Sequence, residues 1–227
     1  MAPGISRASV MSQSIASQLN ASVEATATRT ATTVSRPVMD YDEDDVVARR
    51  AARYDVFINH RGADTKRNVA RLLYDRLQQL TGGGVRSFLD NMSMRPGDRL
   101  EERLAAAIRE CRVGVAIFSP RYFESDFCLR ELAALVEARK IIIPIFCDIK
   151  PSELVLPQAV VDSNAHAPGD IERFRFALRE AKYTVGLAYN SATGDLAELV
   201  SEAANAVLQR IEEMQNVQSR QTIASRL

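Results

Sequence analysis

The sequence lacks the features that mark a membrane protein or a protein built for nucleic acid. Its uninterrupted apolar runs extend over only a few residues, whereas a helix that crosses a bilayer needs about 20. The chain carries 29 basic and 29 acidic side chains, so its formal net charge is +0. No global field therefore attracts nucleic acid or an anionic membrane. We expect no membrane span, and we do not expect nucleic acid as a partner.

Histidine and cysteine are also scarce. The two histidines, His60 and His166, have no cysteine or acid at ligand spacing, so the sequence predicts no metal site and no histidine-based nucleophile triad. The three cysteines, Cys111, Cys128 and Cys147, cannot all pair, and each lies in an apolar context. This pattern is typical of buried thiols in a reducing compartment.

Composition separates a tail from a single domain. Residues 1–50 are mostly Ser, Ala and Thr with few large apolar side chains, and such a segment cannot bury enough surface to offset its ordering entropy. We expect this tail to be disordered and the protein to be cytoplasmic. The scarcity of acids in the tail also fits an organellar transit peptide, so a chloroplast location is the alternative. Residues 51–215 have the patterning of a folded domain, and we expect a flexible tail over residues 216–227.

Strand and helix patterns alternate about five times along the domain. Short apolar runs predict strands at residues 54–58, 85–89, 113–118 and 141–146, with a short strand near 183–187. Amphipathic spacing predicts helices after residue 65, after residue 98, from 127, over 171–182 and over 195–214, with residues 148–167 as a long connection. The alternation predicts an α/β fold in which a doubly wound parallel sheet has helices on both faces.

Two helix starts are predicted from capping residues. Asp64 or Thr65 is expected to cap the first helix, which the glycines at 82–84 terminate. Its apolar face is expected to hold Val69, Leu72, Leu73, Leu77 and Leu80. Asp98 is expected to cap the next helix, after a loop over residues 90–97, with Leu100, Leu104, Ala107 and Ile108 packed inward. The triple glycine follows a helix and precedes a strand, the reverse of a P-loop, and no Gly-Lys-Ser/Thr occurs.

Three segments are expected to meet at the carboxyl ends of the strands, where open α/β sheets bind ligands. They are residues 60–65, 90–97 and 119–131. In the third segment, Glu131 follows Phe127 by one helical turn, so both lie at the edge of the apolar stripe of that helix. A lone acid on an amphipathic helix is usually a solvated surface residue. Its place beside the predicted ligand-binding edge makes Glu131 the candidate functional carboxylate.

Four ordered motifs resemble those of plant-type TIR domains. Residues 54–65 resemble the first box, a strand followed by Arg-Gly-x-Asp-Thr, and residues 88–97 resemble the second box with its mobile loop. Residues 118–132 resemble the signature Ser-x-x-Tyr…Ser-x-Trp-Cys-Leu-x-Glu-Leu, and residues 148–153 resemble the later Asp-x-x-Pro-Ser-Asp element. The resemblance covers roughly residues 54–185 and implies the flavodoxin-like, five-stranded TIR fold. Because little sequence follows, we expect a TIR-only immune protein.

This resemblance implies an NAD⁺ hydrolase of the nucleosidase or ADP-ribosyl cyclase type, with Glu131 as the catalytic carboxylate. NAD⁺ is then the substrate, and no tightly bound cofactor is expected. The implied substrate-binding residues are Arg61, Gly62, Ala63, Asp64, Thr65, Asp90 and Phe127. Phe127 stands where the family usually has Trp, which leaves a smaller stacking surface, and His60 replaces a more usual aromatic residue. The products, nicotinamide and linear or cyclic ADP-ribose, are expected to act as plant immune and cell-death signals sensed by downstream immune proteins.

The first box allows two roles for Arg61. Residues 61–65, at the amino end of a helix, could hold the pyrophosphate through backbone N–H groups and positive charge. Alternatively, Arg61 forms a salt bridge that organises the loop.

The resemblance also implies self-association through a loop that docks onto a neighbouring TIR domain. The residues of this assembly loop are Met92, Met94, Arg95, Pro96 and Gly97. Two other functions remain open. A non-enzymatic adaptor that acts by self-association has no need of the Glu131 carboxylate, and a nucleic-acid-processing cyclic nucleotide synthetase is at odds with the zero net charge.

Overall fold

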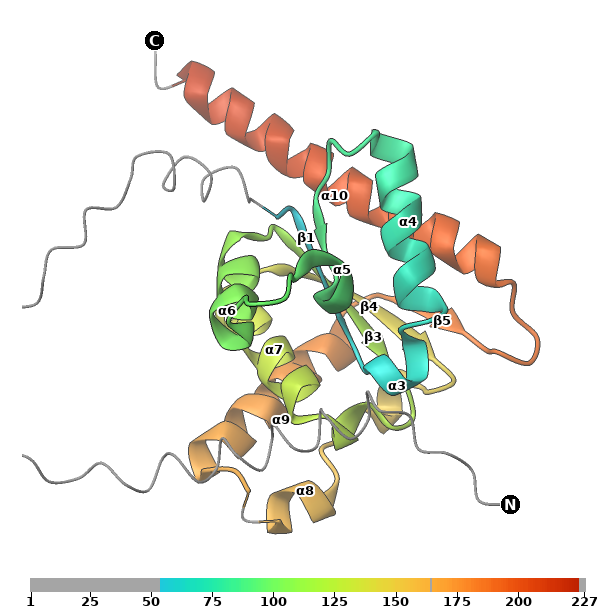
Figure 1. The fold of residues 1–227 in the computed structure, drawn as a ribbon, viewed down its shortest axis with the longest axis vertical. Helices are drawn as coiled ribbons and strands as arrows, with labels where there is room; N and C mark the ends of the chain where they lie inside the picture. The colour runs from blue at the N-terminus through green and yellow to red at the C-terminus, as the bar shows by residue number, and fades with distance from the viewer. Residues whose placement is uncertain (1–53, 164, 225–227) are drawn as a thin grey trace, which may run out of the picture. The chain divides into compact units, whose positions relative to one another are not determined.

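The computed structural model describes residues 54–163 and 165–224, which form a sheet flanked by helices (Figure 1). The sheet has five strands, β1 (Val56–His60), β2 (Ser87–Phe88), β3 (Val113–Phe118), β4 (Ile141–Cys147) and β5 (Leu187–Tyr189). Neighbouring strands pair in parallel in the order β2-β1-β3-β4-β5. This order confirms the predicted flavodoxin-like, doubly wound sheet. The tail predicted over residues 1–50 lies outside the described residues.

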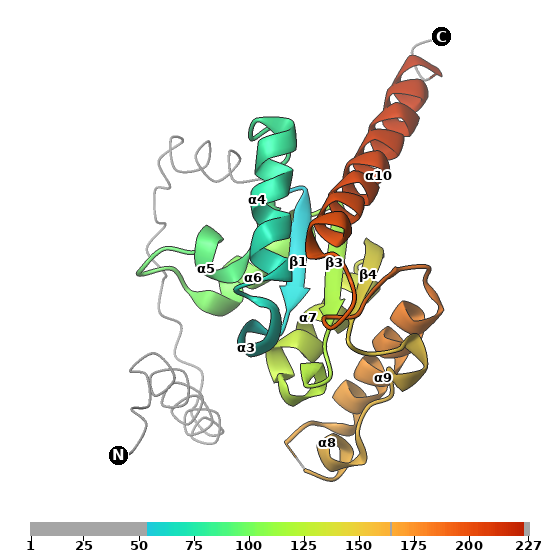
Figure 2. The same ribbon diagram turned by 90° about the vertical axis from the view of Figure 1, so that its right-hand side faces the viewer.

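Helices cover both faces of the sheet, as predicted. In chain order they are α3 (Gly62–Thr65), α4 (Val69–Thr81), α5 (Asp90–Ser93), α6 (Leu100–Glu110), α7 (Asp126–Glu137), α8 (Gln158–Asp162), α9 (Pro168–Tyr183) and α10 (Leu196–Ala224). Two short 3-10 helices, η1 (Tyr122–Glu124) and η2 (Pro151–Glu153), lie between them. Helices α4 and α10 pack on one face, and α6, α7 and α9 pack on the other (Figures 1 and 2).

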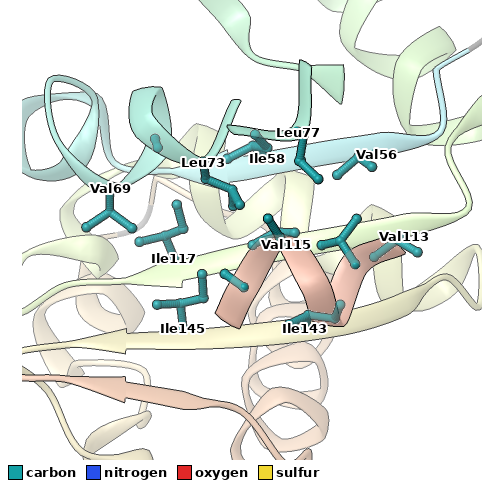
Figure 3. Close-up of a cluster of buried hydrophobic side chains, with 14 of the residues drawn as sticks. Val56, Ile58, Val69, Leu73, Leu77, Val113, Val115, Ile117, Ile143 and Ile145 are labelled. Atoms are coloured by element: carbon teal, nitrogen blue, oxygen red, sulfur yellow. The ribbon is translucent and has the colours of Figure 1, made fainter. Parts of the chain in front are cut away.

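The core under α4 and α10 is built from branched aliphatic side chains. Alternate residues of β1, β3 and β4 point toward the face that α4 and α10 cover, so that Ile58, Val115 and Ile145 share one cluster with Leu73 and Leu77 (Figure 3). Strands β1 and β3 are buried along their whole length rather than on alternate residues, because helices cover both faces and neither side meets water.

The core on the other face is rich in aromatic rings. Phe118 stacks on Phe146 with ring centroids 5.7 Å apart, and Phe57 stacks on Phe88 at 5.2 Å. Gly114 in β3 permits close approach of α7, because a Cβ atom there would lie 3.0 Å from a methyl group of Leu135. Helix α7, which carries Glu131, is thereby held tightly against the sheet.

The predicted start of the first long helix is wrong. Asp64 and Thr65 belong to the short α3, and Asn68 caps α4 by accepting a hydrogen bond from the Val69 amide. Leu72 and Leu80, expected in the core, are each 42% exposed. Neighbouring helix residues point about 100° apart, so Leu72 cannot share the inward direction of Leu73. Gly82 ends the helix in the left-handed conformation, as predicted.

The second predicted cap is also wrong. Helix α6 starts after Arg99, which makes no side-chain cap, and Asp98 instead accepts a hydrogen bond from the Arg95 amide at 2.9 Å. Asp98 therefore closes the turn that precedes the helix. Leu100 lies in the first turn and is 39% exposed, in contrast to the predicted inward position. The segment expected as a loop over residues 90–97 begins with the single helical turn α5.

Several element boundaries differ from those predicted. Strand β1 covers residues 56–60 rather than 54–58, and β2 contracts to two residues. Strand β5 lies at 187–189 rather than 183–187, because α9 continues through Tyr183. The connection over residues 148–167 contains η2 and α8. Helix α10 continues to Ala224 instead of ending at Met214, and Ile211 is among its buried side chains.

Candidate active site at the carboxyl edge of the sheet

The candidate site lies where the strand order reverses, between β1 and β3. The chain leaves β1 into α3 and leaves β3 into η1 and α7, so both connections lie at the carboxyl edge of the sheet (Figure 2). Open α/β sheets bind ligands at this type of position. The third segment joins them through Asp90, whose carboxylate pairs with Lys66 at 3.1 Å. The predicted convergence of three segments is therefore confirmed.

Glu131 is held by an asparagine from the central strand. The Glu131 Oε2 atom accepts a hydrogen bond of 2.9 Å from Asn59 Nδ2, and the same amide nitrogen donates to the Cys128 carbonyl at 3.2 Å. Asn59 is fully buried, so both of its donor hydrogens are used within the protein. Strand β1 thus fixes the position of the carboxyl group on α7.

Tyr122 fixes the orientation of Asn59 in turn. Its hydroxyl lies 2.5 Å from Asn59 Oδ1 and 3.0 Å from the Cys128 carbonyl oxygen, and the side chain is fully buried. A hydroxyl has one proton and serves one acceptor at a time, and the shorter contact is to Asn59. Because the hydroxyl donates to Oδ1, the Nδ2 end of the amide must face Glu131.

Sequence reasoning did not place Asn59 or Tyr122 in the site. Asn59 could have been noticed, because it is a polar residue inside a strand whose neighbours Phe57 and Ile58 are apolar. Tyr122 stood in the quoted signature without an assigned role. Only the fold brings these residues, 63 positions apart, into hydrogen-bond distance.

Burial dominates the electrostatics of Glu131. It raises the pKa of the carboxyl group from 4.5 to about 8, while the hydrogen bond from Asn59 lowers the pKa and the nearby Asp90 charge raises it further. The carboxyl group is therefore neutral below about pH 8 unless a positive charge approaches. Acids with a strongly perturbed pKa are typical of functional sites.

Arg61 forms the salt bridge that was considered as its alternative role. Its Nη1 donates to Asp64 at 2.8 Å, and its Nη2 donates to Glu124 at 2.9 Å. The backbone N–H groups of Asp64 and Thr65 donate to the Arg61 carbonyl, so the protein already uses them. Gly62 and Ala63 are exposed. The role of these five residues in substrate binding stays a prediction.

The other predicted pocket residues lie around this centre. His60 is buried, and burial lowers its pKa, which favours the neutral imidazole. Asp90 lies close enough to Glu131 and His60 for its charge to act on the pKa of both. Phe127, one turn before Glu131 on α7, is 49% exposed. An aromatic ring so exposed is available to a flat ligand.

The assembly loop divides into an internal and an external part. Met94 packs against the cluster that contains Phe57 and Phe88, so its apolar character serves the fold. Met92 is 38% exposed, and the guanidinium of Arg71 donates to its sulfur at 3.3 Å. The remaining three loop residues, Arg95, Pro96 and Gly97, are exposed.

A cavity of about 1010 Å³ lies away from this site. It opens at the amino ends of β4 and β5, between residues 141–143, Gly186 and Leu187, and its rim comes from α7, α9 and α10. Because the strands are parallel, this is the opposite edge of the sheet from Glu131. The three cysteines are buried and free, as predicted.

Among residues 54–163 and 165–224, no helix is long and apolar enough to cross a membrane. In the same residues, no cluster of at least three His, Cys, Asp or Glu side chains could hold a metal ion.

The described domain is thus a parallel α/β sheet with a partly buried glutamate, held by an asparagine, at the switch point of its strand order. The family model for the TIR domain matches residues 53–225. The chain therefore belongs to the TIR domain family, which confirms the family predicted from the motifs.

Individual relatives agree with this assignment. Over 225 residues, 98% of this chain and 97% of the relative, the sequence is 64% identical to the probable 2′ cyclic ADP-D-ribose synthase BdTIR of Brachypodium distachyon. It is 31% identical over 149 residues to the TMV resistance protein N of Nicotiana glutinosa, covering 60% of this chain but 13% of that protein. The TIR domains of the activated Roq1 resistosome match with a TM-score of 0.60 at 26% identity, covering 68% of this chain and 99% of that chain.

Proposed function

We propose that this protein cleaves the bond between nicotinamide and ribose in NAD⁺ and that Glu131 is its catalytic residue. The observation that carries the proposal is the partly buried carboxyl group of Glu131, which Asn59 holds at the switch point of a TIR fold. A relative with 64% identity over 97% of its length is named as a probable 2′ cyclic ADP-D-ribose synthase, so we propose a cyclic ADP-ribose product of the same kind.

The chemistry needs few residues. Nicotinamide leaves as a neutral ring, so no second carboxyl group has to protonate the leaving group, in contrast to the two-carboxylate glycosidases. The ribose gains oxocarbenium-like positive charge, and a carboxylate fixed beside it stabilises that charge most strongly where water is scarce. The nicotinamide ring of NAD⁺ is itself cationic, so an arriving substrate lowers the pKa of Glu131 and favours its ionised form.

The surrounding residues are proposed to bind the rest of the substrate. Phe127 presents a face on which a flat ring can stack, and Arg61 supplies positive charge for the pyrophosphate. Asp90 and residues 62–65 are proposed to line the approach to Glu131. Cyclisation requires a hydroxyl group of the same molecule to capture the ribosyl cation before water does, which a site with little water favours.

We also propose that the protein self-associates through its exposed loop residues and acts in plant immune signalling that ends in cell death. Several relatives are named as disease resistance proteins, and the structural neighbour is part of an activated resistosome. The proposed location is the cytoplasm, with the chloroplast as the alternative. The proposed partners are other TIR domains and immune proteins that sense the nucleotide product.

Mass spectrometry of products after incubation with NAD⁺ tests the proposal. The protein should release nicotinamide and a cyclic ADP-ribose, and Glu131→Ala should lower the rate by about 10²–10³, the usual effect of losing one electrostatic stabiliser. Glu137→Ala is the matched control, because Glu137 lies on the same helix but pairs with Arg173 at the protein surface. An unchanged rate in Glu131→Ala would refute the assignment.

A further inference from the structure

Four charged side chains form a compact cluster beside the candidate active site. Arg61 and Arg121 both donate to the same oxygen, Oε2 of Glu124, at 2.9 Å each. The Nε atom of Arg121 lies 3.1 Å from both oxygens of Glu124. Arg61 donates in addition to Asp64 at 2.8 Å. Two guanidinium groups therefore converge on one carboxylate group.

The two carboxylates of this cluster are held very differently. The Asp64 side chain is 17% exposed, and its second oxygen accepts a hydrogen bond of 2.7 Å from the buried hydroxyl of Ser119. The Glu124 side chain is 53% exposed, and within the described residues it accepts hydrogen bonds from the two arginines. Asp64 is thus a fixed partner of Arg61. Glu124 is a partner that can be exchanged, because ion pairs at the surface contribute little.

Exchange of Glu124 requires only a side-chain rotation. The flanking Tyr122 and Phe123 are buried, and the Glu124 amide donates to the Arg121 carbonyl at 3.1 Å, so the backbone is anchored. With Glu124 in place, two arginines face two carboxylates and the cluster is neutral. With Glu124 turned to solvent, the cluster carries one positive charge and offers guanidinium groups, whose planar forks suit phosphate oxygens.

The cluster lies close to the reactive carboxyl group. Burial raises the pKa of the Cys128 thiol to about 12, and the charges of Glu131, Arg61 and Asp64 also act on this pKa. The carbonyl of the same Cys128 accepts a hydrogen bond from Asn59, which holds Glu131. The charges of Arg61 and Glu131 therefore both reach Cys128, which places the cluster on the same side of α7 as the candidate carboxyl group.

We propose that Arg61 and Arg121 form the binding site for the diphosphate of the dinucleotide and that Glu124 occupies this site as an internal competitor, which the substrate displaces. The identity of the substrate rests on the function proposed above, whereas the preference for a diphosphate rests on the two arginines. Arg121 becomes a substrate-binding residue that no motif indicated, and Glu124 becomes a residue that weakens substrate binding.

The first test compares the kinetics of substitutions at these two positions. Glu124→Gln keeps the shape of the side chain but removes its charge, and it should lower the KM for NAD⁺ about two- to five-fold, the effect of one surface ion pair. Arg121→Gln should raise KM by a similar factor. Both effects should appear in KM rather than in kcat, because neither side chain contacts Glu131. Glu137→Gln, which breaks a comparable surface pair with Arg173, is the control and should leave KM unchanged.

The second test measures the binding of inorganic pyrophosphate by calorimetry and needs no turnover. Glu124→Gln should bind pyrophosphate about two- to five-fold more tightly than the unmodified protein, and Arg121→Gln should bind it more weakly. Glu124→Ala provides a second variant with the same expected direction. Equal pyrophosphate affinity in all of these proteins would overturn the inference. If no protein cleaves NAD⁺, the proposed function fails, but the pyrophosphate measurements still decide whether the arginines form a diphosphate site.

Discussion

The Glu131→Gln variant should be more stable than the unmodified protein, by an amount that grows as the pH rises. The same substitution should remove activity. The folded-state pKa of Glu131 is about 8, against an ordinary value of 4.5. Between these values the unfolded chain has lost the proton and the folded protein keeps it, so the folded protein binds more protons. Stability contributed by the neutral carboxyl group is therefore fully present below pH 4.5 and is lost as the pH rises toward 8. Glutamine has no proton to lose and avoids this loss.

The size of the effect follows from the two pKa values. At about 1.4 kcal/mol for each pH unit, a pKa raised by about 3.5 corresponds to at most about 5 kcal/mol. Glu131 is only partly buried as a residue, and solvent that reaches the carboxyl group reduces this ceiling to roughly 2 kcal/mol. For a domain of this size, that corresponds to a gain of about 4–8 °C in Tm.

Thermal unfolding of both proteins between pH 5 and pH 9 checks the prediction. The difference in Tm should be small at pH 5, should grow as the pH rises, and should level off above pH 8. Glu137→Gln is a control whose change in Tm should have the opposite sign. Arg173 lowers the pKa of Glu137, so the charged form stabilises the folded protein and the variant should lose stability at neutral pH. A Tm difference for Glu131→Gln that stays constant from pH 5 to pH 9 would show that the carboxyl group has no raised pKa, and the reasoning would be refuted.

Three further predictions address the site and its assembly. Initial rates of NAD⁺ cleavage at low substrate should rise with pH up to about 8, because kcat/KM reports the ionisation of Glu131 in the free enzyme; a flat profile from pH 5 to pH 9 would contradict this. Asn59→Ala leaves the buried Tyr122 hydroxyl without its nearer acceptor and should lower the free energy of unfolding by about 1–3 kcal/mol, measured by urea denaturation. Gly97→Arg should reduce both self-association, measured by light scattering, and specific activity. Gly97→Ala is the control, because it imposes the same left-handed backbone strain at φ 98 without a bulky side chain. If bulk is what blocks docking, Gly97→Ala should keep both self-association and activity.

The candidate carboxylate could be predicted because its signals are local. Glu131 lies one turn after Phe127 and next to an apolar strand, and both relations are visible over a few residues of sequence. The alternation of strands and helices was likewise readable, because buried strands and amphipathic helices have different periods. The helix starts predicted from Asp64 and Asp98 were wrong, because several polar residues near each start could serve as the N-cap. The N-cap residues of α4 and α6 are Asn68 and Arg99 instead.

The sequence alone determined the fold class and the family, and it singled out Glu131 as the candidate carboxyl group. Each of these depends on the order and spacing of residues that lie close together in the chain. Tertiary structure alone decided how that group is held and which charges surround it. Asn59 contacts Glu131 across 72 positions, and Arg61 contacts Glu124 across 63. Such contacts form only when the crossover connections bring β1 beside β3, so local patterns cannot encode the raised pKa or the carboxylate placed between two arginines.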